Sequence, residues 1–450
     1  MYIVIVGDGK VGALLTEYLS GEGHDVVVID SNPKVVESAV NSYDVMGICG
    51  NGASYQVQKE AGVQKARLFI AVTSSDELNI LACLTAQRIG ARHTIARVRN
   101  PEYTRQLTFM REELGLSMTV NPEYEAATEI FRVLRFPSAI KLDTFAKGML
   151  DLAEVNIGED GILDGTPLYA LHDKFKVNVL VCAVLREDNV FIPSGDFILR
   201  EGDKIHVSGA RSELAAFFKL LGIYKHRVKD VIVVGGGKIG YYLAQQLLES
   251  GRDVTVIEQD EERCQELSEL LPKASIINGD GTDQEVLAEQ GIDKCDACVA
   301  LTGIDEENII ISMYAQSLQV NKVVTKINRI SYDMLGSIGL ETVISPKSIS
   351  ANKIVRYVRA LHNSEGRSMQ TLYKFLNNKA EALEFIVTEE AGVTGVPLKD
   401  MRLKKNLLIA GIIRQNKIIF PRGNDCLEEG DSVIVVTAGR FMSNLSEILE

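Results

Sequence analysis

The sequence predicts an α/β protein with two doubly wound parallel-sheet domains, each followed by a small α+β module. Short β-branched runs alternate with helical stretches, a glycine-rich loop follows the first run, and the whole pattern occurs twice. We place the four domains at residues 1–145, 146–224, 225–370 and 371–450. The polar, basic stretch at residues 225–229 marks the boundary between the halves.

The repeat pairs the halves almost residue by residue. Residues 3–30 align with residues 231–258, which places the glycines of the first loop on those of the second. Further along, GNG at residues 50–52 meets GDG at residues 279–281. The modules repeat as well, because the Glu-Gly-Asp segment that ends at Asp203 recurs at Asp431. The order of parts is therefore A-B-A′-B′.

Each predicted element has its own signal. In the first A unit, buried β-branched runs predict strands and the stretches between them predict helices. The strands are residues 3–6, 25–29 and 67–72, and the helices are residues 11–20, 55–61 and 77–89. A capping side chain before a proline, Asn121-Pro122 or Ser345-Pro346, predicts the closing helices 123–135 and 347–361.

The B units predict hairpins with polar turns. The first hairpin joins residues 177–185 and 190–192 through residues 186–189. The second joins residues 407–413 and 418–420 through residues 414–417. A final strand follows each Glu-Gly-Asp turn, at residues 204–207 and 432–436.

Composition excludes several classes of protein. Hydrophobic residues at 46% and charged residues at 24% are typical of a globular chain, and no apolar run approaches the roughly 20 residues of a membrane-spanning helix. A formal net charge of −13 opposes binding to nucleic acid or anionic lipid. Seven scattered cysteines and a start without a secretory signal predict a cytoplasmic protein with reduced thiols. Any membrane association should depend on another protein.

The two glycine loops predict Rossmann-like nucleotide sites. In the sequence Gly7-x-Gly9-x-x-Gly12, the glycines allow a tight turn, a close approach of a diphosphate, and close helix–strand packing. Asp30 and Glu258 end the second strands, where a carboxylate accepts hydrogen bonds from a ribose diol and repels a 2′-phosphate. Both sites therefore favour NAD(H), or ATP and ADP, over NADP(H). The alternative is that the glycines remain for packing alone.

Further residues are expected at the same sheet edge. Lys10 and Lys238 lie inside the loops. One interpretation is that each lysine reaches a terminal phosphate of the nucleotide, and the alternative is that each is a solvated side chain in the first turn of its helix. Arg97 and Lys326 end the following strand and add positive charge. The candidate nucleotide-binding residues are Gly7, Asp8, Gly9, Lys10, Val11, Gly12, Asp30, Asn51, Thr73, Ser74 and Arg97 in the first half, and Gly235, Gly236, Gly237, Lys238, Ile239, Gly240, Glu258, Asp280, Thr302 and Lys326 in the second.

No catalytic or metal site is predicted. Cys295 and Cys298 form a CxxC pair without a second pair or a nearby histidine, and Cys298 lies in a predicted buried strand. The six histidines do not recur between the halves, and no acid or base for hydride transfer repeats. A non-enzymatic role is expected, and an NAD-dependent oxidoreductase is the alternative.

Together, the paired GxGxxG loops with Asp30 or Glu258, the AVTSSDELN and ALTGIDEEN segments and the PSGD and PRGN hairpins resemble the TrkA family. These are regulatory subunits of Trk-type potassium transporters, built from tandem regulator-of-potassium-conductance (RCK) domains. The resemblance implies a peripheral protein on the inner face of the cell membrane. It also implies a homotetramer bound to a potassium-translocating membrane subunit, whose gate is biased by NAD(H) and ATP or ADP. A regulator of another cation channel or antiporter is a further alternative.

Overall fold

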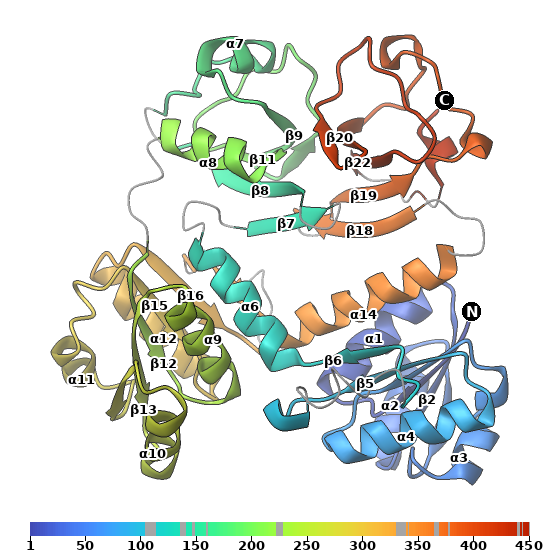
Figure 1. Cartoon of the computed structure of the whole chain (residues 1–450), viewed down its shortest axis with the longest axis vertical. Coiled ribbons are helices and arrows are strands. Elements are labelled where there is room, and N and C mark those ends of the chain that lie inside the picture. The colour runs from blue at the N-terminus through green and yellow to red at the C-terminus, as the bar shows by residue number, and fades with distance from the viewer. Residues whose placement is uncertain are drawn as a thin grey trace. The chain divides into compact units, whose positions relative to one another are not determined.

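The computed structural model describes residues 1–103, 114–135, 141–145, 149–158, 161–221, 228–329, 339–340, 342–363, 369–376, 379–438, 442 and 444–449. Two compact units form from alternating parts of the chain. One contains Met1–Phe131 and Lys229–Val358, and the other contains Arg132–Val228 and Arg359–Glu450. The A domains therefore share one unit and the B modules share the other (Figure 1).

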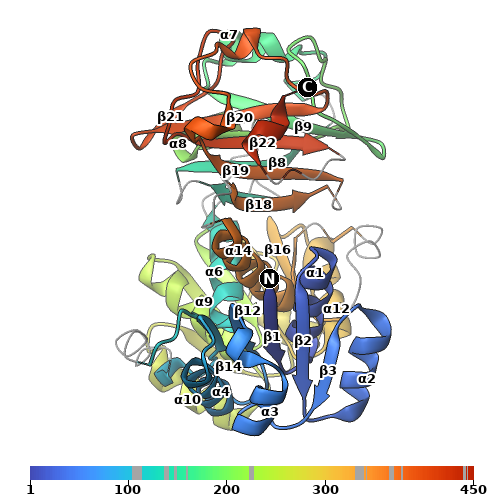
Figure 2. The same cartoon turned by 90° about the vertical axis from the view of Figure 1, so that its right-hand side faces the viewer.

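The first A domain is a parallel sheet with the strand order β3-β2-β1-β4-β5-β6. β1 lies between β2 and β4, so the order reverses at the end of β1, and Figure 2 shows α2 and α4 on opposite sides of the sheet. This doubly wound topology is the predicted one. The elements are β1 (Tyr2–Val6), α1 (Lys10–Gly21), β2 (Asp25–Asp30), α2 (Pro33–Ser42), β3 (Met46–Cys49), α3 (Tyr55–Glu60), β4 (Leu68–Ala71), α4 (Asp76–Ile89), β5 (His93–Arg97), β6 (Met118–Val120) and α6 (Pro122–Arg135).

The second A domain repeats this sheet in the order β14-β13-β12-β15-β16-β17. Its central strands β12 and β15 are buried on both faces, which explains their continuous runs of apolar residues. The elements are β12 (Asp230–Val234), α9 (Lys238–Glu249), β13 (Asp253–Glu258), α10 (Glu261–Leu270), β14 (Ser275–Asn278), α11 (Gln284–Glu289), β15 (Ala297–Ala300), α12 (Asp305–Ser317), β16 (Lys322–Lys326), β17 (Val343–Ile344) and α14 (Pro346–Asn363).

The closing helix α6 joins the two A domains within their unit. Its start is capped as predicted, because the Tyr124 amide donates to Asn121 Oδ1 at 3.0 Å. Asn121 Nδ2 also donates to the hydroxyl of Tyr242 in α9 at 3.2 Å, and the Tyr124 and Tyr242 rings meet edge to face at 5.4 Å. In the same unit α14 contributes an ion pair from Lys353 to Glu125 of α6. The A domains thus contact one another through specific polar and aromatic groups.

Each B module contains a five-stranded antiparallel sheet. The first has the order β10-β9-β11-β8-β7 and the second β18-β19-β22-β20-β21. The first contains β7 (Lys141–Phe145), β8 (Leu150–Asn156), α7 (Leu171–Phe175), β9 (Val179–Arg186), β10 (Asn189–Phe191), β11 (Lys204–Ala210) and α8 (Arg211–Leu220). The second contains β18 (Met369–Phe375), β19 (Ala380–Ile386), β20 (Leu407–Arg414), β21 (Lys417–Ile419) and β22 (Ser432–Ala438).

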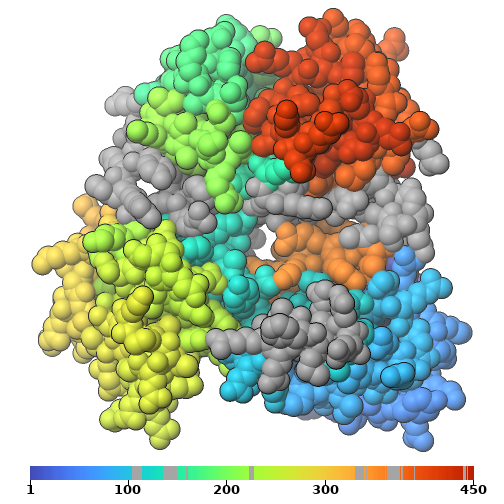
Figure 3. Space-filling model, viewed as in Figure 1, coloured from blue at the N-terminus to red at the C-terminus, as the bar shows by residue number. Residues whose placement is uncertain are grey.

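The two B modules share a hydrophobic core. Leu152 and Ala183 of the first module lie in one buried cluster with Phe375 and Ile434 of the second. β9 lies beside β20 in Figures 1 and 2, and the surfaces of the two modules meet in Figure 3. Ser208 Oγ donates to the Ala410 carbonyl across this contact at 2.9 Å. Because the core is common, the two modules should unfold together.

A buried ionic group lies next to this shared core. His206 is 2% exposed, and its ring centroid lies 4.5 Å from that of Phe375. Its Nε2 is 3.1 Å from Glu154, which also pairs with Lys204 at 3.2 Å. Burial by itself would raise the pKa of Glu154, but the adjacent His206 and Lys204 side chains stabilise its charged form and lower its pKa to about 2.

This depressed pKa predicts acid sensitivity of the B unit. Because the folded pKa lies below the ordinary value of about 4.3, the stabilisation is complete above that value and is lost as the pH falls toward 2. Denaturant unfolding between about pH 5 and 3 should show a smaller pH dependence in Glu154→Gln than in the parent. Glu187→Gln, in an exposed turn, should leave the dependence unchanged. The same slope in parent and Glu154→Gln would contradict this prediction.

Among the helices that the structure describes, none is long and apolar enough to cross a membrane.

Candidate functional site

The first glycine loop has the geometry that its spacing predicts. Gly7 has φ +87°, and a Cβ there would lie 2.9 Å from the Thr73 Cα, so only glycine fits this turn. A Cβ on Gly12 would lie 2.0 Å from the Gly7 carbonyl oxygen, which shows how tightly α1 packs on β1. At Gly9 a Cβ would meet nothing within 4 Å. The middle glycine therefore leaves its backbone open to a ligand.

The second loop repeats this arrangement. Gly235 has φ +107°, a Cβ on Gly240 would lie 2.2 Å from the Gly235 carbonyl oxygen, and Gly237 faces open space. Gly9 and Gly237 are the N-caps of α1 and α9, and neither helix start receives a side-chain cap. Both helices thus present backbone N–H groups at their positive ends, a favourable place for a diphosphate.

The two predicted carboxylates are fixed by backbone amides at the ends of β2 and β13. Asp30 accepts from the Asp8 and Asn32 amides, both at 2.8 Å. Glu258 accepts from the Gly236 amide at 2.7 Å and from the Asp260 amide at 3.0 Å. Each carboxylate oxygen has a second lone pair for a ribose hydroxyl, so the orientation suits the predicted role.

A buried asparagine ties together the strand ends on the other side of each loop. In the first domain, the Thr73 amide donates to Asn79 Oδ1 at 2.8 Å, and Asn79 Nδ2 donates to the Arg97 carbonyl at 2.9 Å. In the second domain, Asn308 makes the equivalent bonds to Thr302 and Lys326 at 2.7 and 3.0 Å. These asparagines hold the predicted threonines at the sheet edge.

The predicted cations occupy two different settings. The Arg97 guanidinium donates to the Thr73 carbonyl, and Lys326 Nζ donates to the Leu301 carbonyl at 3.3 Å. Burial lowers the pKa of both groups, and the charge of Lys10 lowers that of Lys326 further. Lys10 and Lys238 are exposed at the first positions of α1 and α9.

Several predicted residues contribute backbone or loop structure. The side chains of Asn51 and Asp280 accept from the Ala53 amide at 3.0 Å and the Thr282 amide at 2.8 Å, so they fix their own turns. Val11 and Ile239 are buried in the core, and the Ser74 carbonyl accepts from the Arg99 guanidinium. For Val11 and Ile239, only the backbone could serve a ligand.

Comparison with known protein families agrees with this geometry over most of the chain. The TrkA-N domain model matches residues 3–122 and 231–346, and the TrkA-C domain model matches residues 152–222 and 382–449. The chain belongs to the TrkA family. The two A domains are thus TrkA-N domains and the two B modules are TrkA-C domains.

Relatives match the chain from end to end. It is 33% identical to "Trk system potassium uptake protein TrkA homolog 1" of Methanosarcina mazei, covering 99% of each chain. It is 32% identical to a TrkA homolog of Archaeoglobus fulgidus, covering 100% of each, and 31% identical to TrkA of Halomonas elongata, covering 97% and 95%. The solved GsuK channel bound to NAD is similar in fold, with a TM-score of 0.62, 21% identity and coverage of 97% of this chain and 77% of that one.

Two charged residues near the TrkA-N loops were not predicted. Arg263, in the first turn of α10, donates from Nε to the Gly236 carbonyl at 2.8 Å, and therefore adds a cation beside the Glu258 site. Glu123, at the start of α6, lies near enough to Arg97 and Lys238 for their charges to lower its pKa, although burial raises it overall. Arg263 aligns with Val35, so comparison of the halves at that position could have indicated it.

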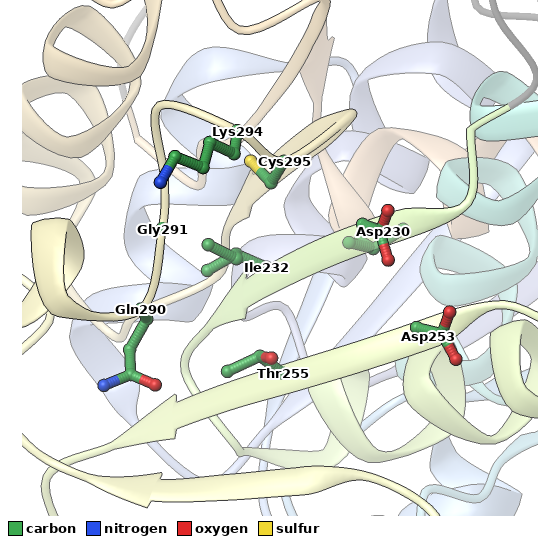
Figure 4. A pocket seen from close by; sticks show the side chains of 9 residues that line it. Asp230, Ile232, Asp253, Thr255, Gln290, Gly291, Lys294 and Cys295 are labelled. Atoms are coloured by element: carbon green, nitrogen blue, oxygen red, sulfur yellow. The ribbon is translucent and has the colours of Figure 1, made fainter.

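A cavity of about 280 Å³ lies elsewhere on the second TrkA-N domain. Asp230 and Asp253 line it at the starts of β12 and β13, opposite Lys294 and Cys295 (Figure 4). The glycine loop follows the other end of β12, so this cavity is separate from the candidate site. Burial raises the pKa of the Cys295 thiol to about 12, which leaves it protonated at neutral pH. Among the described residues, no group of acidic, histidine or cysteine side chains is arranged to hold a metal ion.

Proposed function

We propose that this protein is a nucleotide-binding regulatory subunit of a Trk-type potassium uptake system. One observation carries the proposal. Each TrkA-N domain places an uncapped helix start, an open glycine and a fixed carboxylate at one sheet edge. The full-length relatives carry the name of Trk potassium uptake proteins, which supports the transport role.

The proposed ligands are NAD(H), with ATP or ADP as alternative or additional ligands. The diphosphate would lie over Gly9 or Gly237 at the helix start, and the ribose diol would bind Asp30 or Glu258. A similar fold occurs in a channel solved with NAD, which supports this choice. Lys10 and Lys238, both exposed at the helix starts, are placed to neutralise phosphate charge. The remaining residues of the predicted set would line or shape the same clefts.

Regulation would act through the contact between the two TrkA-N domains. The charge of Lys10 in the first domain contributes to lowering the pKa of Lys326 in the second. The charge of Lys238 in the second domain favours the ionised form of Glu123 in the first. A bound anion changes the balance of these charges, so it would favour one arrangement of the domains through differential affinity. No catalytic group is part of this proposal.

The proposed partner is a potassium-translocating membrane subunit of the Trk type. We expect this chain to form a homotetramer that binds this subunit on the cytoplasmic face of the cell membrane. We also propose domain boundaries near residues 145, 225 and 370; the first falls at the end of β7, whose strand pairs with β8 of the first TrkA-C domain. Co-purification with a Trk-type membrane subunit would test the partner, and measurement of the assembly mass would test the homotetramer. A monomer that binds no transporter would contradict them.

Removal of either carboxylate should weaken nucleotide binding in its own domain. We expect Asp30→Ala and Glu258→Ala each to lower affinity about 10- to 100-fold at one site, because each loses charge-assisted hydrogen bonds of about 1.5–3 kcal/mol. Calorimetric titration with NAD, NADH, ADP and ATP measures this directly. Asp25→Ala and Asp253→Ala change exposed residues at the opposite ends of the same strands and should bind like the parent. Absence of binding by all four nucleotides would overturn the proposal.

A further inference from the structure

The first glycine loop contains a buried carboxylate that the second lacks. Asp8 is 8% exposed, and its Oδ1 accepts from the hydroxyl of the fully buried Thr16 at 2.8 Å. The corresponding residue of the second loop is Gly236. A Cβ on Gly236 would lie 2.4 Å from Leu267 Cδ1, so a carboxylate does not fit there.

Three aligned positions change together to create this difference. The first domain has Asp8, Thr16 and Ala39, and the second has Gly236, Ala244 and Leu267. All six positions are buried, and the exposures of Thr16, Ala39, Ala244 and Leu267 range from 0% to 3%. The first domain therefore has space and a hydrogen-bond donor for a carboxylate, whereas the second fills the same region with leucine.

The surroundings of Asp8 are predominantly acidic. Asp30 approaches from the end of β2, and its carboxylate accepts the Asp8 backbone amide at 2.8 Å. Glu17 of α1 and Tyr43 after α2 face the same region, because the charges of Glu17 and Asp8 add to the effect of burial in raising the pKa of the Tyr43 hydroxyl. Burial raises the pKa of Asp8, the Thr16 hydroxyl lowers it, and the charge of Asp30 raises it. Lys10 follows in the same loop but is exposed.

We propose that nucleotide binding in the first TrkA-N domain is coupled to proton uptake by the Asp8 carboxyl group, and that binding in the second domain is not. This inference rests on the proposed nucleotide site. A diphosphate at the start of α1 would bring negative charge to the loop that carries Asp8, and like charges disfavour ionisation. In the second loop Gly236 carries no charge, and Arg263 adds a cation at its carbonyl. The first domain would thus sense pH together with nucleotide.

The sign of the coupling follows from linkage. The bound state holds the proton more tightly than the free state, so affinity is greatest when Asp8 is already protonated. Affinity then falls as pH rises between the free-state and bound-state pKa values, by at most about tenfold per pH unit for one proton. Above the bound-state pKa it stays at the lower value.

Calorimetric titration with NAD tests the proposal on the full chain. The diphosphate of NAD has no proton to exchange near neutral pH, so protonation of the ligand does not confound the result. A Glu258→Ala background isolates the first site, and titrations from about pH 5.5 to 8 in buffers of different ionisation enthalpy count the protons taken up. We expect weaker binding at higher pH and uptake of up to one proton per NAD. Asp8→Asn should abolish both effects.

A second variant separates titration from a structural role. Thr16→Val removes the hydroxyl that lowers the Asp8 pKa, so the pH dependence should move to higher pH. Asp44→Asn, an exposed carboxylate of the same domain, should leave it in place. The Asp30→Ala background, in which only the second site binds, should show no coupling. Thermal unfolding of each variant identifies any that fail to fold.

The outcomes are distinct. A pH slope and proton uptake that persist in Asp8→Asn, or that are absent from the parent first site, would overturn the coupling. Equal coupling at both sites would also overturn it. If the parent chain bound no NAD at any pH, the nucleotide site itself would be wrong.

Discussion

Gly12→Ala is expected to destabilise the first TrkA-N domain by about 3 kcal/mol or more, the upper end of the cost of overpacking. Its Cβ would lie 2.0 Å from the Gly7 carbonyl oxygen, and no side-chain rotation can move either atom away, because the backbone fixes both positions. Relief requires α1 to move from β1, which disturbs the buried residues Leu15 and Leu19. Denaturant unfolding measures the loss.

The neighbouring glycines provide matched controls for this result. Gly21→Ala, at the last position of α1, meets nothing within 4 Å and should keep the stability of the parent. Gly9→Ala also meets open space, so the fold should remain, but its methyl group would occupy the proposed place of the diphosphate. We expect NAD affinity to fall by more than about tenfold in Gly9→Ala. Parent-like affinity there would contradict the placement of the ligand, and a parent-like stability of Gly12→Ala would contradict the packing argument.

The features that sequence predicts well are those with local causes. The central strands β1, β2 and β4 match the predicted runs within two residues at each end, since their burial on both faces demands continuous apolar residues. The glycine turns are predictable because positive φ and absent Cβ atoms are requirements of the backbone itself. The repeat made these inferences stronger by providing each one twice.

Other elements carry weaker local signals. β3 and β14 are four-residue edge strands with exposed and partly buried positions, so they lack the continuous apolar run of a central strand. β7 and β18 lie at the edges of the module sheets and pair with the next strand along the chain, but their sequences, KLDTF and MQTLYKF, interrupt apolar residues with polar ones. None of these four strands was predicted from the sequence.

The site shows the same division. The positions of Asp30 and Glu258 follow from strand length and glycine spacing. The setting of Asp8 depends on the hydroxyl of Thr16 in α1, and the contact of Arg263 with the Gly236 carbonyl depends on how α10 packs against the loop. Such contacts between helices and loops are tertiary, and neither composition nor spacing records them.

Asp203→Ala is expected to cost the TrkA-C unit about 3 kcal/mol. The Asp203 side chain is 0% exposed and receives two bonds of 2.7 Å from the Arg186 guanidinium and one of 2.8 Å from the Arg200 amide. Its removal leaves the Arg186 guanidinium and the Arg200 amide without an acceptor. Loss of one partner from a buried ion pair is strongly destabilising, because the remaining charge is uncompensated. Because Arg186 remains one quarter exposed, we expect the lower end of the usual 3–5 kcal/mol.

The second module offers an internal replicate. Asp431 is 1% exposed, and Arg414 binds it at 2.8 and 2.9 Å. Asp431→Ala should therefore cost a similar amount, whereas Glu201→Ala, an exposed neighbour of Asp203, should cost less than about 0.5 kcal/mol. Denaturant unfolding gives all three values. A loss below about 1 kcal/mol in both aspartate variants would show that the pairs are solvated rather than buried.

The shared core predicts how these losses appear. Ala183 of β9 and Phe375 of β18 belong to one buried cluster, so unfolding of either module exposes apolar surface of the other. Either aspartate variant should therefore lower a single unfolding transition that both modules share. Residue-level hydrogen exchange would show amides of β11 and β22 losing protection together in each variant. Loss confined to the mutated module would contradict the common core.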